Sequence, residues 1–201
     1  MKLFYSPSSP YVRKVIIVAL ETGLNDRIER LPAQTTPIAP NPDLKASAPL
    51  AKVPTLVTDS GLALFDSRVI AEYLDSLHSG PKFFPAGDAR WPALRNHALG
   101  DGLLDAALLV RYEGFLRPEA LRWSEWSSGQ WGKVEGALAD IEAQADGLGD
   151  TLDIGTVAIG CALGYLDFRF GDSGWRTKFP KAAALAGRLG KRPSFATTVP
   201  G

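Results

Sequence analysis

The sequence has little of what metal and redox centres require, because its 201 residues include one cysteine, Cys161, and two histidines, His78 and His97. A single cysteine excludes a disulfide framework within the chain and a CxxC redox pair. The two histidines lie far apart, with no cysteine or paired carboxylates at ligand spacing, so we expect no metal site. Cys161 lies among apolar residues and is interpreted as a buried structural thiol. This cysteine usage favours a reducing, cytoplasmic compartment.

An excess of charge of one sign is also missing, since 22 basic residues balance 22 acidic ones. Proteins that bind nucleic acid usually carry a strong basic surplus, so we expect no nucleic-acid partner. No apolar run approaches the ~20 residues of a membrane span, and the first residues lack the basic and apolar pattern of a secretion signal. We therefore expect no membrane association.

The first informative stretch is SPSSPYVRKV, residues 6–15, which follows the strand-forming residues LFY. Proline is tolerated at the first helical position, so Ser9 is predicted to cap a helix that begins at Pro10. Apolar residues at helical spacing continue to Gly23, a stop signal. Ser9 is thus expected at the positive end of a helix dipole, where an anion is stabilised. Taken alone, the role of an N-cap would account for this serine.

Residues 1–79 are predicted to form a small α/β domain with the order βαβ followed by ββα. Three further β runs are expected at 28–31, 53–58 and 62–65. A helix with one apolar stripe is expected to begin near Asp66 and Ser67. Gly and Pro interrupt the pattern across residues 79–90, which form the predicted domain boundary.

Residues 89–201 contain no convincing strand and are predicted to form an all-helical domain. The periodic segments run from about Trp91 to Phe115, Ser124 to Gly147, Asp153 to Phe168, and Lys178 to Leu189. In the second of them, apolar residues alternate steps of three and four along the chain, which is typical of a helix with one buried face. The sequence therefore predicts an α/β domain followed by an all-α domain.

The first domain contains three motifs whose order along the chain is informative. They are Ser9 at a helix start, KVPTL (52–56) with a proline where a strand should begin, and FDS (65–67) at the next helix start. A proline at that place removes a ladder donor and is compatible with a cis bond. Together the motifs resemble the thioredoxin-like domain of the cytosolic glutathione transferases, and the resemblance covers essentially the whole chain. TLDIGTVAIGCALGYLDFRF (151–170) looks like the core helix of that family, and the chain looks most like bacterial serine-type members.

The resemblance implies a glutathione site in the first domain. Ser9 matches the residue that hydrogen-bonds the glutathione sulfur, although Ser6 and Ser8 are nearby competitors for that contact. Val53, before Pro54, would pair through its backbone with the cysteinyl part of glutathione. The charged ends of the ligand would be held by Lys52 at the glycyl carboxylate and by Asp66 and Ser67 at the γ-glutamyl group.

The implied activity is that of a glutathione transferase, in which glutathione acts as co-substrate and no metal takes part. The serine would stabilise the thiolate, and the sulfur would attack a small hydrophobic electrophile in a detoxification reaction. The resemblance places the electrophile pocket at Tyr11, Arg111 and Tyr112, and it implies a homodimer.

Two other functions remain open on the sequence alone. A non-catalytic module could keep the transferase fold as a binding or assembly platform. A glutaredoxin-like reductase is disfavoured, because residue 9 is serine where such an enzyme needs cysteine. Arg169 also has two interpretations, as a partner of an acid across the core or as a surface cation near a helix C-terminus.

Overall fold

The computed structural model describes residues 1–201, which divide into two compact units. The N-terminal unit comprises Met1–Pro85 together with Ser194–Gly201, and the helical unit comprises Ala86–Pro193. The sequence assigned all residues after 89 to the helical domain. The structure instead groups the last eight residues with the N-terminal unit, because their contacts are made there.

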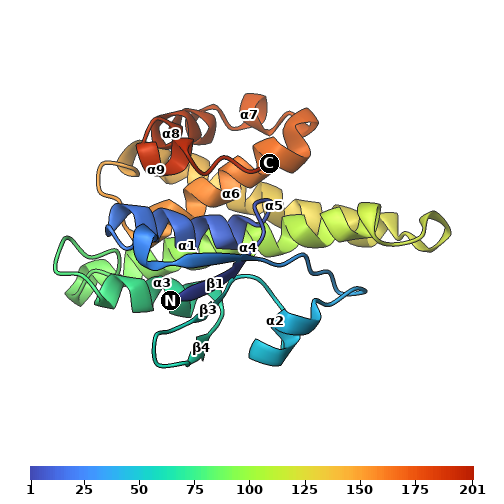
Figure 1. The fold of residues 1–201 in the computed structure, drawn as a ribbon. Helices are drawn as coiled ribbons and strands as arrows, with labels where there is room; N and C mark the ends of the chain where they lie inside the picture. Colours follow the sequence, from blue (N-terminus) through green and yellow to red (C-terminus); the bar gives the residue numbers. More distant parts are fainter. The chain divides into compact units, whose positions relative to one another are not determined.

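The N-terminal unit has the predicted order βαβ followed by ββα (Figure 1). Its elements are β1 (Lys2–Tyr5), α1 (Pro10–Glu21), β2 (Glu29–Pro32), α2 (Pro42–Ser47), β3 (Thr55–Val57), β4 (Ala63–Leu64) and α3 (Ser67–Ser76). The strands form one mixed sheet in the order β2-β1-β3-β4. β1 pairs with β2 in parallel and with β3 antiparallel, and β3 pairs antiparallel with β4.

Alternation along β1 sends successive side chains to opposite faces of this sheet. Phe4 packs with Ala33 and Leu44, so the short helix α2 covers one face. Helices α1 and α3 pack against one another on the other side, away from α2 (Figure 1). The sheet is therefore covered on both faces.

The C-terminal segment returns to α1. It includes α9 (Pro193–Ala196) and reaches Arg13, a residue that is 7% exposed. The Arg13 guanidinium donates to the Phe195 carbonyl at 3.1 Å and to the Thr198 hydroxyl at 3.3 Å. The Ser194 hydroxyl donates to a Glu21 carboxylate oxygen at 2.5 Å. Both halves of α1 are thus tied to residues that follow the helical unit in the chain.

The helical unit contains the four predicted helices and one short addition. They are α4 (Arg90–Phe115), α5 (Ser124–Gln144), α6 (Ile154–Phe170), α7 (Trp175–Lys178) and α8 (Pro180–Gly190). Single 3-10 turns in the chain lie at Asn25–Arg27, Gly87–Ala89, Glu119–Leu121, Ala145–Gly147 and Gly171–Ser173. Asp153 caps α6 by accepting a hydrogen bond from the Thr156 backbone N–H at 2.7 Å, and Cys161 is fully buried within α6.

Two glycines allow α4 and α6 to pack closely. A Cβ on Gly100 would lie 2.7 Å from the backbone carbon of Ala158, and a Cβ on Gly155 would lie 2.6 Å from the Ala93 carbonyl oxygen. Ala93 of α4 meets Gly155 of α6, and Gly100, farther along α4, meets Ala158, farther along α6. The two helices therefore run parallel. This register fixes which residues face one another farther along both helices.

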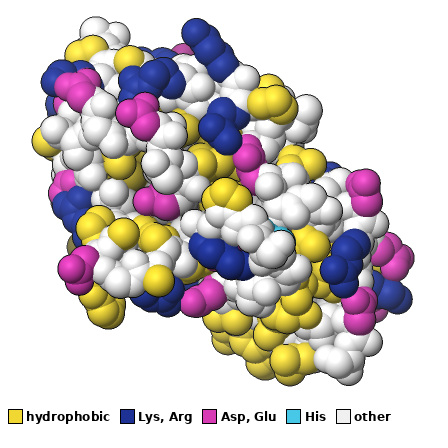
Figure 2. Space-filling view, turned by 90° about the vertical axis from the view of Figure 1, so that its left-hand side faces the viewer, with side chains coloured by type: hydrophobic (Ala, Val, Ile, Leu, Met, Phe, Trp, Pro, Cys, Tyr) yellow, Lys and Arg dark blue, Asp and Glu magenta, His cyan; other side chains and the backbone are white.

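The distribution of charge at the surface agrees with the equal numbers of basic and acidic residues in the sequence. On the face drawn in Figure 2, basic and acidic side chains are interspersed, and neither sign forms a continuous patch. None of the helices combines the length and the hydropathy that a membrane span requires.

Candidate glutathione site

The turn between β1 and α1 presents Ser9 as the N-cap of α1. Its Oγ accepts a hydrogen bond from the Val12 backbone N–H at 3.3 Å, and its hydroxyl hydrogen has no acceptor in the chain. The neighbouring Ser6 and Ser8 hydroxyls lie 3.2 Å apart and form one hydrogen bond, in which one hydroxyl donates and the other accepts. No acidic residue occupies the first turn of α1, so the positive end of its dipole is not offset there. Of the three serines, Ser9 is the one that both caps α1 and keeps its donor free.

The segment before β3 presents backbone groups. The Val53–Pro54 bond is cis, as the sequence indicated it could be. The Thr55 hydroxyl donates to the Lys52 carbonyl at 2.9 Å and closes the turn. The Val53 backbone N–H and C=O form no hydrogen bond with the rest of the chain. Because backbone polar groups are nearly always paired in folded proteins, these two are suited to pairing with an extended peptide.

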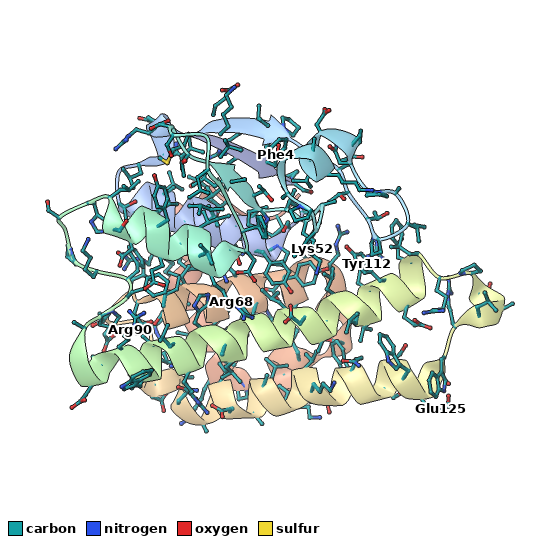
Figure 3. The ribbon with its side chains drawn as sticks, turned by 90° about the horizontal axis from the view of Figure 1, so that it is seen from below. Phe4, Lys52, Arg68, Arg90, Tyr112 and Glu125 are labelled. Carbon is teal, nitrogen blue, oxygen red and sulfur yellow. The ribbon has the colours of Figure 1, made fainter.

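The start of α3 presents a carboxylate and a hydroxyl. Asp66 is the N-cap and accepts from the Arg68 backbone N–H at 2.9 Å through Oδ1. Ser67, the first helical residue, is 2% exposed, and its hydroxyl has no partner in the chain. Figure 3 labels Arg68 in this first turn and Lys52 on the loop before β3. The Lys52 side chain is exposed and forms no ion pair.

Strand register brings these segments to one end of the sheet. Phe4 near the end of β1 lies opposite Thr55 at the start of β3, and Leu64 at the end of β4 lies opposite Leu56. The turn after β1, the segment before β3 and the turn after β4 therefore lie next to one another. An uncommitted hydroxyl, a backbone pair and a carboxylate at a helix start meet at this end.

The helical unit brings a second group of polar side chains together. Burial raises the pKa of Tyr112 on α4. Burial is also the largest effect on the pKa of Tyr165 on α6, which it raises, and this residue is 2% exposed. Arg169 and Arg111 act electrostatically to lower the pKa of Tyr165 against this effect of burial, and Tyr112 acts to raise it. Arg169 pairs with no acid, so the first of its two sequence interpretations was wrong. Tyr11 lies on α1 in the N-terminal unit, where it is half-buried.

Family models match both units. The glutathione S-transferase N-terminal domain matches residues 8–77, and the glutathione S-transferase C-terminal domain matches residues 124–188. The chain belongs to the glutathione S-transferase family. The resemblance stated from the SPSSPYVRKV, KVPTL and FDS motifs is confirmed, as are the fold class and its thioredoxin-like first unit.

Several members of the glutathione S-transferase family align with the whole length of this chain. The uncharacterized GST-like protein YibF of Escherichia coli K12 is 37% identical over an alignment that covers 100% of this chain and 98% of the relative. A glutathione transferase family member from Pseudomonas fluorescens Pf-5, with bound glutathione, is 44% identical with a TM-score of 0.97, and the match covers 100% and 98% of the two chains. A second structure of that family member, with bound S-(propanoic acid)-glutathione, gives 44% identity and a TM-score of 0.93 over 100% and 99% of the chains.

Sequence reasoning named most of the polar groups at the end of the sheet but did not connect Tyr165 with Tyr112. A signal in the sequence could have drawn attention to Tyr165. It lies four residues before Arg169, so the two residues share one face of α6. The structure contains no cluster of three or more His, Cys, Asp or Glu side chains that could hold a metal ion.

Proposed function

We propose that this chain binds glutathione at the end of the sheet where Ser9, Val53 and Ser67 meet, and that it transfers glutathione to a small hydrophobic electrophile. The observation that carries this proposal is the set of uncommitted polar groups contributed by three separate segments of the N-terminal unit. Folded proteins rarely leave so many polar groups without partners, so a ligand with a matching set of groups is expected there.

Glutathione has the groups that this set requires. Its cysteinyl N–H and C=O can pair with those of Val53, in the manner of an added strand. Its γ-glutamyl carboxylate suits the N-terminus of α3 at Ser67, and its ammonium suits Asp66. Its glycyl carboxylate would be met by Lys52. The bound glutathione in the Pseudomonas fluorescens relative, at 44% identity, supports this assignment.

The chemistry is activation of a thiol. A free thiol has a pKa near ~8.5, and the thiolate is the nucleophile. A hydrogen bond donated by Ser9, together with the positive end of the α1 dipole, stabilises the thiolate and lowers that pKa. The sulfur then attacks the electrophile and forms a carbon–sulfur bond. Ser9 donates a hydrogen bond throughout and does not act as a base.

The electrophile is proposed to bind Tyr11, Arg111 and Tyr112, as the family resemblance implies. The S-(propanoic acid)-glutathione bound by the same relative supports a site that accepts glutathione with a small substituent on sulfur. We also propose that the protein acts as a homodimer in the cytoplasm, in keeping with the resemblance.

Calorimetric titration with glutathione tests the site. Wild type should bind saturably, and Asp66→Asn should bind about tenfold more weakly, since a hydrogen bond to a charged group contributes about 1.5–3 kcal/mol. Asparagine is itself a good N-cap, so this variant removes the charge while keeping the acceptor for the Arg68 N–H. Asp43→Asn, at an exposed position in α2, is the matched control and should bind as wild type does. Folded wild-type protein that binds no glutathione would refute the proposal.

Turnover distinguishes the enzyme from a binding module. With binding established, glutathione consumption in a panel of alkyl and aryl halides and activated alkenes should exceed the uncatalysed rate for at least one of them. Saturable binding with no turnover across the panel would instead support the platform function.

A further inference from the structure

Two arginines of the helical unit carry charges that no acid balances. The Arg111 guanidinium lies 4.1 Å from the centre of the Phe115 ring, and the Arg169 guanidinium lies 3.8 Å from that of Phe168. Neither forms an ion pair. Other arginines of the same unit do so, namely Arg95 with Asp140, Arg117 with Glu113, and Arg176 with Asp167. Arg122 and Arg188 also lack an acid, but they donate to backbone carbonyls. Arg111 and Arg169 differ from all of these, since they donate to neither a carboxylate nor a backbone carbonyl and contact an aromatic ring instead.

The packing of α4 on α6 brings the two arginines together. Gly100 contacts Ala158, and the helices run parallel. About three helical turns beyond this contact, α4 has reached Arg111 and α6 has reached Arg169. Figure 3 shows Tyr112 near the C-terminal end of α4, and it follows Arg111 directly in the chain.

Two phenols complete the group. Tyr112 follows Arg111 on α4, and Tyr165 lies one helical turn before Arg169 on α6, so the register of the two helices places these four residues near the same level; we call them the arginine–tyrosine cluster. Electrostatic effects of Arg169, Tyr112 and Arg111 on the pKa of Tyr165 agree with this placement. Burial raises the pKa of both tyrosines, which keeps their hydroxyls protonated at neutral pH. The cluster therefore offers two guanidinium groups and two phenol hydroxyls as donors, and no carboxylate acts on its buried member, Tyr165.

We propose that the electrophiles of this protein carry a carboxylate and that the arginine–tyrosine cluster binds it. Guanidinium groups match carboxylates in a bidentate geometry, and phenol hydroxyls donate to the same oxygens. The aromatic rings beside the two arginines suit the short apolar part of such a molecule. This inference rests on the proposed function, because it assigns the substrate class of the proposed transferase.

A haloalkanoate illustrates the reaction. The thiol proton passes to solvent, and the thiolate sulfur attacks the carbon that bears the halogen. The carbon–sulfur bond forms as the carbon–halogen bond breaks, and the halide leaves with the bonding electron pair. With chloroacetate, the products are S-(carboxymethyl)glutathione and chloride. The carboxylate takes no part in the bond changes and serves to hold the substrate.

Two glutathione conjugates of nearly equal shape test the inference. S-(carboxymethyl)glutathione carries the carboxylate, and S-(carbamoylmethyl)glutathione carries a neutral amide in its place. By calorimetry, wild type should bind the acid about tenfold or more tightly than the amide, which is the range for a hydrogen-bonded charged group. The ratio should fall toward one in an Arg111→Gln, Arg169→Gln double variant and recover in part when both residues are lysine.

Lys133→Gln is the matched control, since it removes one positive charge from an exposed position on α5 and should keep the wild-type ratio. The rate ratio of chloroacetate to chloroacetamide, corrected for the uncatalysed reactions, should follow the same order among the variants. Circular dichroism confirms that each variant is folded.

The outcomes separate the two proposals. If wild type binds neither glutathione nor either conjugate, the proposed function fails. If it binds glutathione but binds both conjugates equally, the substrate class alone is refuted. A preference for the acid that survives in the double variant would place the carboxylate elsewhere, and it would overturn the role of the cluster.

Discussion

Replacing Ser9 with alanine should raise the pKa of the glutathione thiol in the complex. The substitution removes the hydroxyl that caps α1 and whose hydrogen has no acceptor in the chain. It leaves the α1 dipole in place, because the backbone amides of the first turn remain. The variant therefore separates the contribution of the hydroxyl from that of the helix.

The magnitude follows from one hydrogen bond to a charged group. Such a bond contributes about 1.5–3 kcal/mol, and one pKa unit corresponds to about 1.4 kcal/mol, so the pKa should rise by about one to two units. The bond from the Val12 N–H to Ser9 Oγ is long, at 3.3 Å. Loss of this cap should therefore cost no more than about 1 kcal/mol of stability.

The assay is titration of the thiolate by its ultraviolet absorbance in protein saturated with glutathione. Ser9→Thr, which keeps a hydroxyl, should stay close to wild type. Ser6→Ala is a second control, because the Ser6 hydroxyl is already paired with that of Ser8. A thiol pKa that is the same in Ser9→Ala and wild type would refute the role of the serine, even if glutathione binds normally.

Four further variants test other parts of the structure. Ser9→Cys should create measurable thiol–disulfide exchange with a glutathione mixed disulfide, and no gain would contradict the place given to residue 9. Gly100→Ala would set a methyl 2.7 Å from the α6 backbone and should lower the free energy of unfolding in urea by about 1–3 kcal/mol or more. Asp153→Ala should remove the α6 N-cap at a cost of about 1 kcal/mol. The Trp123 backbone N–H holds the pKa of Glu113 below its usual range, so Glu113→Gln should destabilise at neutral pH, and its difference from wild type should shrink as pH falls through the lowered value.

The order of elements followed from the sequence because its signals are local. A serine before a proline marked the start of α1, and one apolar stripe marked α3. The same signals located most of the proposed glutathione site, since Ser9, Asp66 and Ser67 all lie at helix starts. Caps and stripes depend on residues a few positions apart, so they can be recognised without tertiary structure.

The remaining features depend on residues far apart in the chain. The partners of Arg13 are Phe195 and Thr198, and no local pattern pairs them with α1. The approach of Tyr165 to Tyr112 results from close packing of α4 on α6, which the two interface glycines make possible. Such pairings are set by the register of packed helices, and periodicity identifies a buried face without naming what it meets.

The return of the C-terminal segment to α1 has a consequence for synthesis on the ribosome. The N-terminal unit consists of two segments of the chain, and the entire helical unit lies between them in the sequence. Until residues 194–201 emerge, the Arg13 guanidinium lacks the carbonyl and hydroxyl that accept its hydrogen bonds, and burying it unpaired is unfavourable. We therefore expect the nascent first unit to hold α1 loosely while the helices are being made. Emergence of residues 194–201, rather than of residues 1–85 alone, would then set the moment at which Ser9 is held in its final place.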